Sequence, residues 1–140
     1  MLPQSEMIVV TTPAVGAQRV ATRAVTMARK SHLHVLGVIE NMSAFTCEHG
    51  HTHAVFGEGG GARLAADENL PLLGCVPLEP SVSTGGDTGA PIVLSDGEAS
   101  TAIRSITDRL VNDLAPPISM SGCSARMLDA ALAALDATES

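Results

Sequence analysis

Residues 7–40 have the sequence MIVVTTPAVGAQRVATRAVTMARKSHLHVLGVIE, and this stretch decides the fold class. It opens with the apolar run MIVV at residues 7–10 and closes with HVLGVIE at residues 34–40. Short apolar runs rich in β-branched residues are typical of strands that are buried on both faces. Two such runs separated by a helix-length segment predict a βαβ unit, in which the two strands are parallel and adjacent.

The segment between the two runs has the pattern of an amphipathic helix. Thr12 is a suitable N-cap, and Pro13 has the fixed φ that suits a first helical residue. The helix is expected to extend to about Ser31. Four residues at helical spacing are predicted to face the core: Ala17, Val20, Ala24 and Met27.

Shorter elements follow the βαβ unit. A helix is predicted over residues 61–69, and a strand over residues 72–76 with Cys75 buried inside it. The segments 41–61 and 79–91 are rich in glycine and polar residues, so we predict long loops there, the second with room for one helical turn.

The last strong helical pattern covers residues 98–114. Ser95 and Glu98 have the spacing of a capping box, which marks the start of a helix. The Pro116–Pro117 pair is expected to end the pattern. The apolar positions predicted to pack on the sheet are Ala99, Ile103, Ile106, Leu110 and Leu114.

This order of elements predicts the α/β class, with a partial doubly wound parallel sheet flanked by helices. We expect one domain over residues 1–115, followed by a linker and a C-terminal helical tail over residues 116–140. A sheet of three parallel strands has two exposed edges, and exposed edges are a liability in an isolated protein. The sequence therefore indicates a part of a larger domain or a chain with an obligate partner.

The composition excludes several classes of protein. With 140 residues, 45% of them hydrophobic, the chain can bury a core of its own. A net charge of −7 and only two aromatic residues disfavour binding to nucleic acid or to an anionic membrane. We see no signal peptide, no membrane-spanning run and no disulfide framework, so we expect a cytoplasmic protein.

The sharpest cluster of reactive side chains follows the second strand. Cys47, His49, His51 and His53 alternate, so they would project from one side of an extended strand. Thiolate and imidazole ligands suit zinc or a transition metal. An exposed polar loop accounts for the same residues, and we favour that interpretation.

Glycine-rich segments raise the question of phosphate binding. The phosphate-loop pattern G-x-x-x-x-G-K-[ST] is absent, and Lys30 is the only lysine. The run of residues 57–61, GEGGG, lies before a predicted helix and is able to cradle an anion through backbone N–H groups. A hinge or a close approach of two backbones explains the glycines equally simply, and we favour that alternative.

Four longer motifs carry a resemblance to a known family. They resemble, in order and spacing, the second half of the Mrp/ApbC family of iron–sulfur cluster carrier ATPases, which belong to the P-loop class and are related to MinD. The similarity extends over about residues 1–114, and VVTTP at 9–13 also fits it. The motifs are VLGVIENMSAFTC (35–47), VFGEGGGARLA (55–65), LPLLGCVPLEP (70–80) and GGDTGAPIV (85–93).

The resemblance implies roles for particular residues. Asn41 matches an asparagine that contacts adenine in MinD-like ATPases, and Pro77 and Leu78 match the loop beside the base of ATP. Cys47 matches the first cysteine of a CPxC motif that holds a 4Fe-4S cluster between two subunits. Gly50 stands where that motif has its second cysteine, so this chain offers one thiolate where the family offers two.

Three functions are compatible with these observations. The first is a partial carrier ATPase that retains base recognition and the dimer surface, lacks phosphate chemistry and hydrolyses no ATP alone. The second is a non-enzymatic module that pairs with an N-terminal half, and the third is a small Cys/His metal-binding protein. The expected partners are a second copy or the missing N-terminal half, with apo iron–sulfur proteins implied by the resemblance.

Overall fold

The computed structural model describes residues 5–114. A 3-10 turn at Ile92–Leu94 precedes the last helix, and a π-helical turn at Leu110–Leu114 extends it. The other elements, in chain order, are β1 (Glu6–Thr11), α1 (Val15–Lys30), β2 (His34–Asn41), β3 (Phe45–Thr46), β4 (Thr52–His53), α2 (Gly60–Asp67), β5 (Leu72–Val76), α3 (Pro80–Thr88) and α4 (Glu98–Arg109).

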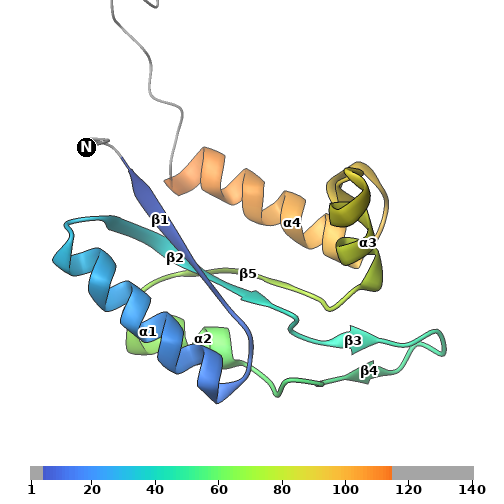
Figure 1. Cartoon of the computed structure of the whole chain (residues 1–140), viewed down its shortest axis with the longest axis horizontal. Helices are drawn as coiled ribbons and strands as arrows, with labels where there is room; N and C mark the ends of the chain where they lie inside the picture. Colours follow the sequence, from blue (N-terminus) through green and yellow to red (C-terminus); the bar gives the residue numbers. More distant parts are fainter. Residues whose placement is uncertain (1–4, 115–140) are drawn as a thin grey trace, which may run out of the picture.

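The main sheet has the strand order β1-β2-β5, and both strand pairs are parallel. Helices α1 and α2 lie on one face of the sheet, and α3 and α4 lie on the other (Figure 1). The predicted βαβ unit is confirmed, because β1 and β2 are parallel neighbours with Val9 opposite Val38. The chain therefore has the α/β class that its sequence predicts, with a parallel sheet between helices.

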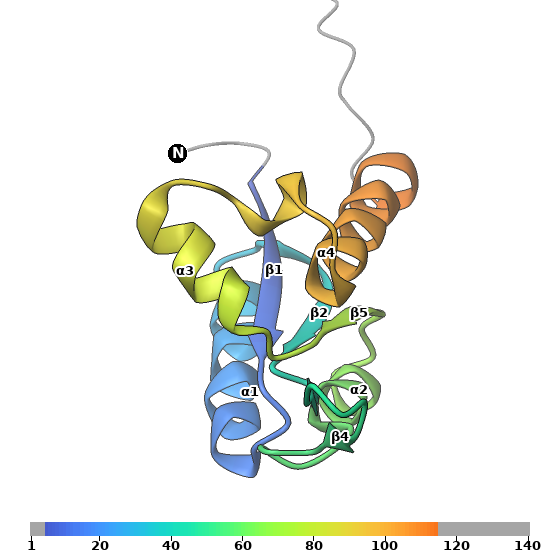
Figure 2. The same ribbon diagram turned by 90° about the vertical axis from the view of Figure 1, so that its right-hand side faces the viewer.

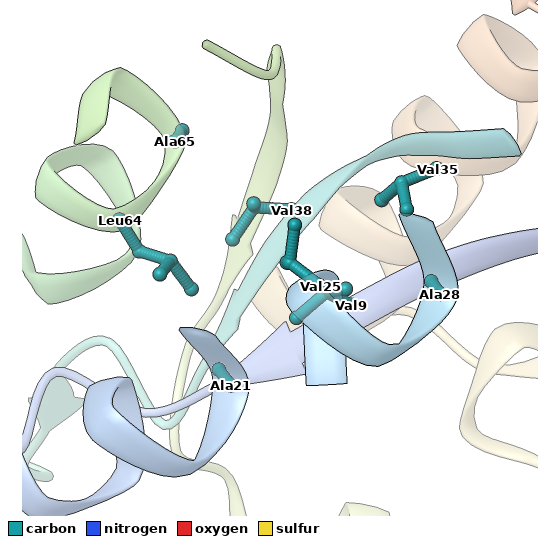
Figure 3. Packing of buried hydrophobic residues seen from close by; sticks show 8 residues of the cluster. All are labelled: Val9, Ala21, Val25, Ala28, Val35, Val38, Leu64 and Ala65. Carbon is teal, nitrogen blue, oxygen red and sulfur yellow. The ribbon is translucent and has the colours of Figure 1, made fainter. Parts of the chain in front are cut away.

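The face of the sheet under α1 and α2 holds the larger of two aliphatic cores. Val25 of α1 and Val38 of β2 are completely buried (Figure 3). Burying one such side chain contributes about 1.5–3 kcal/mol, so this cluster is a main source of stability. Its eight buried members are Val9, Ala21, Val25, Ala28, Val35, Val38, Leu64 and Ala65.

The predicted inward face of α1 is wrong by one residue position. Val20 and Met27 were expected in the core but are 64% and 70% exposed. One position along a helix is a rotation of about 100°, which turns these apolar side chains away from the sheet. The core face of α1 consists instead of Ala21, Val25 and Ala28.

Both edge strands are less buried than their sequences suggest. In β1, Val9 is 3% exposed but Val10 on the other face is 57% exposed. In β5, Cys75 is exposed rather than buried. A continuous apolar run predicts burial on both faces because it is typical of strands that other elements cover on both sides. An edge strand has fewer neighbours, so some of its apolar side chains stay exposed.

The second core lies between β5 and α4 and confirms the helix predicted over residues 98–114. Ala99 is fully buried, Ile106 is 5% exposed, and Leu73 of β5 packs against the same cluster. A Cβ atom added at Gly74 would lie 2.6 Å from a side-chain carbon of Ile106, so a larger residue there would displace Ile106 from this contact.

Two predicted helix starts are wrong in detail. Helix α1 begins at Val15 with Ala14 as N-cap, so Thr12 and Pro13 precede it. Pro13 is fully buried, and its carbonyl accepts a hydrogen bond from Nε2 of Gln18 at 2.7 Å. Ala14 has an extended backbone conformation, so the helix begins only at Val15.

No capping box forms at the start of α4. Gly97 is the N-cap, and the Ser95 hydroxyl donates to the carbonyl of Ile92 instead. The cap comes from a residue distant in sequence, because Oε2 of Glu79 accepts a hydrogen bond from the N–H of Ala99 at 3.1 Å. A carboxylate at this position also favours the positive end of the helix dipole.

The two predicted loops contain regular structure. Segment 41–61 includes a hairpin of β3 and β4, in which Phe45 pairs with His53. Segment 79–91 includes α3, which starts on Pro80 and ends at Gly89 with φ of 70°. Proline at a first helical position and glycine in the left-handed conformation after the last one are standard helix boundaries.

Some predictions concern residues outside the described part of the chain. The linker and helical tail over residues 116–140, with Pro116–Pro117, lie there. Within residues 5–114, no helix is both long and apolar enough to cross a lipid bilayer.

Candidate functional site

The carboxyl ends of β2 and β5 bring the predicted base-binding residues to one edge of the sheet. Asn41 is the last residue of β2, and Pro77 directly follows β5. Two backbone hydrogen bonds join the loops, from Ser43 N–H to the carbonyl of Val76 at 3.1 Å and from Leu78 N–H to the carbonyl of Ala44 at 2.7 Å. In parallel α/β sheets, this edge is the common position of ligand sites.

Asn41 and the Pro77–Leu78 loop face different hollows of this edge. Asn41 borders a groove beside β1, and its Oδ1 accepts a hydrogen bond from the N–H of Met42 at 2.9 Å. Pro77 and Leu78 line a cavity of about 210 Å³. Its other lining residues are Phe45, Thr46, Glu79, Pro80 and Glu98.

The β3–β4 hairpin leaves the sheet at the same edge and carries Cys47 at its tip. The N–H of Cys47 donates to the carbonyl of His51 at 2.9 Å, and the N–H of Gly50 donates to the carbonyl of Cys47 at 2.8 Å. Cys47 is half-buried, while His49 and His51 are exposed. The side chain that the family resemblance identifies as a cluster ligand therefore lies in a tight, projecting turn.

This turn changes the interpretation of the Cys/His alternation. An extended strand would place Cys47 and the three histidines on one side, but the chain reverses direction between Cys47 and His51. Residues 5–114 contain no group of three or more His, Cys, Asp or Glu side chains that is placed to hold a metal ion. The alternation therefore does not produce a metal site within the described residues.

At Gly50 the turn has space for a side chain, but its backbone conformation disfavours residues other than glycine. Its φ is +78°, and a Cβ added there would have no atom within 4 Å. A non-glycine residue at such a φ costs about 1–2 kcal/mol. A second cysteine at position 50 would thus stand three residues after Cys47, in the same turn and facing open space.

Glu40 of β2 holds the start of α2, which follows the hairpin, against the sheet. Its side chain is 4% exposed, and its Oε2 accepts a hydrogen bond from the N–H of Gly61 at 2.5 Å. A Cβ at Gly61 would lie 2.7 Å from the Cβ of Glu40. Of the two favoured alternatives, a hinge or a close approach of two backbones, the second is confirmed at Gly60 and Gly61, and a carboxylate of the chain itself occupies the N-terminus of α2.

Sequence reasoning missed the structural part that Glu40 plays. The available signal was an acidic residue at the end of a buried strand, where an uncompensated charge is costly and must find donors. Glu40 also lies opposite Cys75 in the β2–β5 register. Partial burial of the sulfur and, next, the nearby Glu40 carboxylate raise the pKa of the Cys75 thiol, which keeps it protonated and weakly reactive at neutral pH.

Glu79 is the second carboxylate at this edge that caps a helix. Its Oε1 accepts a hydrogen bond from the Ser81 hydroxyl at 2.6 Å, and its Oε2 accepts one from the N–H of Ala99. These two bonds, with the Ser81 hydroxyl as the larger cause, hold the pKa of Glu79 below its ordinary value. Glu79 therefore joins the loop after β5 to the start of α4 in its ionised form.

Comparison with known proteins gives consistent matches in sequence. Residues 1–112 match a ParA family model described as "NUBPL iron-transfer P-loop NTPase". The iron–sulfur cluster carrier protein of Mycobacterium tuberculosis strain H37Rv is 43% identical over 119 residues, which cover 79% of this chain and 31% of that protein. The chain thus spans about a third of the length of this curated relative.

Solved structures support the same fold. The MinD cell division protein of Aquifex aeolicus superposes with a TM-score of 0.62 at 23% identity, over 84% of this chain and 48% of that chain. A nucleotide-binding protein in complex with ADP from Archaeoglobus fulgidus superposes with a TM-score of 0.52 at 31% identity, over 59% and 35%. The resemblance to iron–sulfur cluster carriers is therefore confirmed, and the chain belongs to the ParA/NUBPL family of iron-transfer P-loop NTPases.

Proposed function

We propose that this chain handles iron–sulfur clusters as one part of a P-loop carrier. The observation that carries the proposal is the carboxyl edge of the sheet. There, the loops after β2 and β5 are hydrogen-bonded to each other, and the hairpin with Cys47 leaves from the same place. In the proposed carrier, Pro77 and Leu78 contact the base of ATP, and Asn41, which borders a separate groove, makes the third contact that the family resemblance implies.

Phosphate chemistry belongs to another part of the carrier in this proposal. Residues 1–140 lack the lysine-bearing loop that holds the phosphates in P-loop proteins. The base alone supplies little of the affinity, because most contacts in such sites are made to the phosphates and Mg²⁺. The chain by itself is then a weak nucleotide binder, and the complete cytoplasmic carrier acts on apo iron–sulfur proteins.

The cluster is the cargo of this carrier, and Cys47 is its proposed ligand. A homodimer with one thiolate from each chain offers two sulfur ligands, whereas 4Fe-4S clusters are usually held by four. We therefore propose that the wild-type chain is colourless as purified and takes up at most a sub-stoichiometric cluster. The alternative of a small Cys/His metal protein gains no support from the hairpin, because within residues 5–114 no three His, Cys, Asp or Glu side chains are placed to hold a metal ion.

Anaerobic reconstitution with ferrous iron and sulfide tests the proposal. Gly50→Cys restores the second thiolate of the turn and should raise bound iron and sulfide well above the wild-type level. Gly50→Ser is the matched control, because it imposes the same backbone strain without adding a thiolate. Cys47→Ala should abolish the gain in the double variant.

Two results would contradict the proposal. One is iron uptake that does not depend on Cys47, since the hairpin would then not be the binding site. The other is a Gly50→Cys variant that remains folded by circular dichroism but binds no more iron than Gly50→Ser.

A further inference from the structure

The cavity beside Pro77 and Leu78 is small, and much of its wall is apolar. Its volume is about 210 Å³. Pockets for drug-sized ligands have volumes of roughly 300–1,000 Å³, so this cavity has the size for one ring system rather than for a whole nucleotide. Phe45 of β3 and Pro80 of α3 complete its apolar wall. The faces of a heterocyclic base pack well on side chains of this kind.

Three segments of the chain fix the walls of the cavity. The N–H of Leu78 donates to the carbonyl of Ala44 at 2.7 Å, which holds the loop after β5 against the start of β3. The start of α4 lies beside the same loop (Figures 1 and 2). The hydroxyl of Thr46 in β3 donates to Oε2 of Glu98, the first residue of α4, at 3.4 Å. The cavity is therefore formed by contacts within the chain itself.

Two carboxylates line this cavity, and they differ in the hydrogen bonds that they accept. Both oxygens of Glu79 are engaged, Oε1 by the Ser81 hydroxyl and Oε2 by the N–H of Ala99. Within residues 5–114, the carboxylate of Glu98 accepts only the long hydrogen bond from Thr46. An ionised carboxylate has about four acceptor positions, so Glu98 is able to accept further hydrogen bonds from a ligand.

We propose that Glu98 sets the base preference of this cavity by accepting a hydrogen bond from the exocyclic amino group of a purine. An ionised carboxylate only accepts hydrogen bonds, so it favours a base that presents an N–H donor over one that lacks it. Hydrogen bonds to a charged acceptor are also stronger than those between neutral groups. The inference rests on the proposed function, and it names the residue that selects the base.

The composition of the wall favours a base over a metal ion. Within the described residues, no three His, Cys, Asp or Glu side chains are placed to hold a metal. Glu79 is engaged in capping α4, so a cation would be left with Glu98 and the hydroxyl of Thr46. Calcium and magnesium ions take six or more oxygen ligands, whereas one acceptor beside an apolar wall suits an amino-bearing ring.

Nucleosides test the inference, because they lack phosphate and therefore report on the base cavity alone. The isotope-labelled 140-residue chain is titrated by NMR with adenosine and with purine riboside, which has hydrogen in place of the amino group. We expect both to shift the backbone amides of Thr46, Leu78 and Glu98. The dissociation constant for adenosine should be about five to ten times lower, because only adenosine gives Glu98 a hydrogen bond.

Substitutions of Glu98 separate its hydrogen bond from its charge. Glu98→Ala should bring the two dissociation constants to within about twofold of each other, because the acceptor is lost. Glu98→Gln should keep the preference for adenosine, because a side-chain amide both accepts from the amino group of adenine and donates to a ring nitrogen. Asp108→Ala is the matched control, since it removes an exposed carboxylate further along α4 and should leave the preference unchanged. Circular dichroism establishes that each variant is folded.

Several results would overturn the inference. They are equal affinity of the wild-type chain for the two nucleosides, a preference that survives in Glu98→Ala, and a preference that is lost in Glu98→Gln or Asp108→Ala. Absence of shifts at the cavity up to the solubility limit of adenosine would overturn the inference together with the proposed base contacts. Iron uptake by Gly50→Cys is measured separately, so failure of base selection and failure of cluster handling are distinguishable.

Discussion

The two edges of the sheet differ in how the chain itself covers them. Along β5, α4 packs closely enough for Ile106 to touch Gly74, and Arg109 donates a hydrogen bond to the outward carbonyl of Leu72. Along β1, Val10 and Val20 remain exposed beside a backbone that pairs only with β2 within residues 5–114. Neither edge strand has a second partner strand among these residues, but Arg109 of α4 contacts the backbone of β5.

This difference teaches that apolar surface alone does not identify a core. The side chains of α1 that face the sheet and those that face the groove are both aliphatic, but only the first set is buried within the chain. The exposed set is as aliphatic as the buried one but contributes little to the core. Stability should therefore depend on the buried clusters on both faces of the sheet, and only weakly on the exposed side chains of α1.

The largest expected effect concerns two apolar truncations of similar size on the two sides. Ile106→Ala removes buried carbon atoms from the β5 side and should lower the free energy of unfolding by about 2–5 kcal/mol. Met27→Ala removes atoms that are exposed on the β1 side and should change it by less than about 0.5 kcal/mol. Urea unfolding measures both, and equal losses would remove the distinction between the two edges.

The next effect concerns the arginine that covers the β5 edge. Arg109→Ala leaves the carbonyl of Leu72 without its donor, which should cost about 1–1.5 kcal/mol. Arg23→Ala on the open side of α1 removes an exposed charge and should be nearly neutral. Thermal unfolding of the pair checks the prediction, and an equal shift in both variants would show that Arg109 contributes only charge.

A smaller and pH-dependent effect concerns Glu79, whose carboxylate caps α4. Glu79→Ala should cost about 0.5–1 kcal/mol at neutral pH. The folded state lowers the pKa of this carboxyl, so its stabilisation is complete above the ordinary glutamate pKa and is lost as the pH falls through the folded value. The stabilities of wild type and variant should therefore converge in acid; a gap that stays constant with pH would contradict ionisation as the cause.

The smallest expected signal is ATP turnover by the chain alone, which should be zero within error. The lysine-bearing phosphate loop is absent from residues 1–140, and most contacts to nucleotide in P-loop proteins are made to the phosphates and Mg²⁺. A coupled assay on protein free of contaminating ATPases measures this. Turnover that survives rigorous purification would place phosphate chemistry within this chain and contradict the proposed division of the carrier.

The sequence predicted the elements that depend on local patterns. The runs around Val9 and Val38 gave parallel neighbouring strands, and the stripe through Ile106 gave a helix on the sheet. The inward face of α1 was wrong because Val20 and Met27 are apolar but exposed, so the apolar surface of the helix is wider than the face that packs on the sheet. Periodicity identifies apolar faces, but it does not tell which of two faces is covered.

Features made by contacts distant in sequence were beyond local reasoning. Glu79 caps α4 from 20 residues away, so the local Ser95–Glu98 spacing suggested the wrong cap. The strands β3 and β4 have two residues each, too few for an alternating pattern, so the turn that carries Cys47 was predicted as a loop. The resemblance to carriers identified Asn41, Pro77 and Leu78 as site residues. The fold explains only why they lie together at the carboxyl end of the sheet.

Hydrogen exchange on the two edges tests the central claim most directly. The amides of β1 and β5 are compared with those of β2 in the 140-residue chain. The account predicts slow exchange along β2, which pairs on both sides, and faster exchange at the alternate amides of β1 that face away from β2. Uniform protection along β1, equal to that of β2, would contradict it.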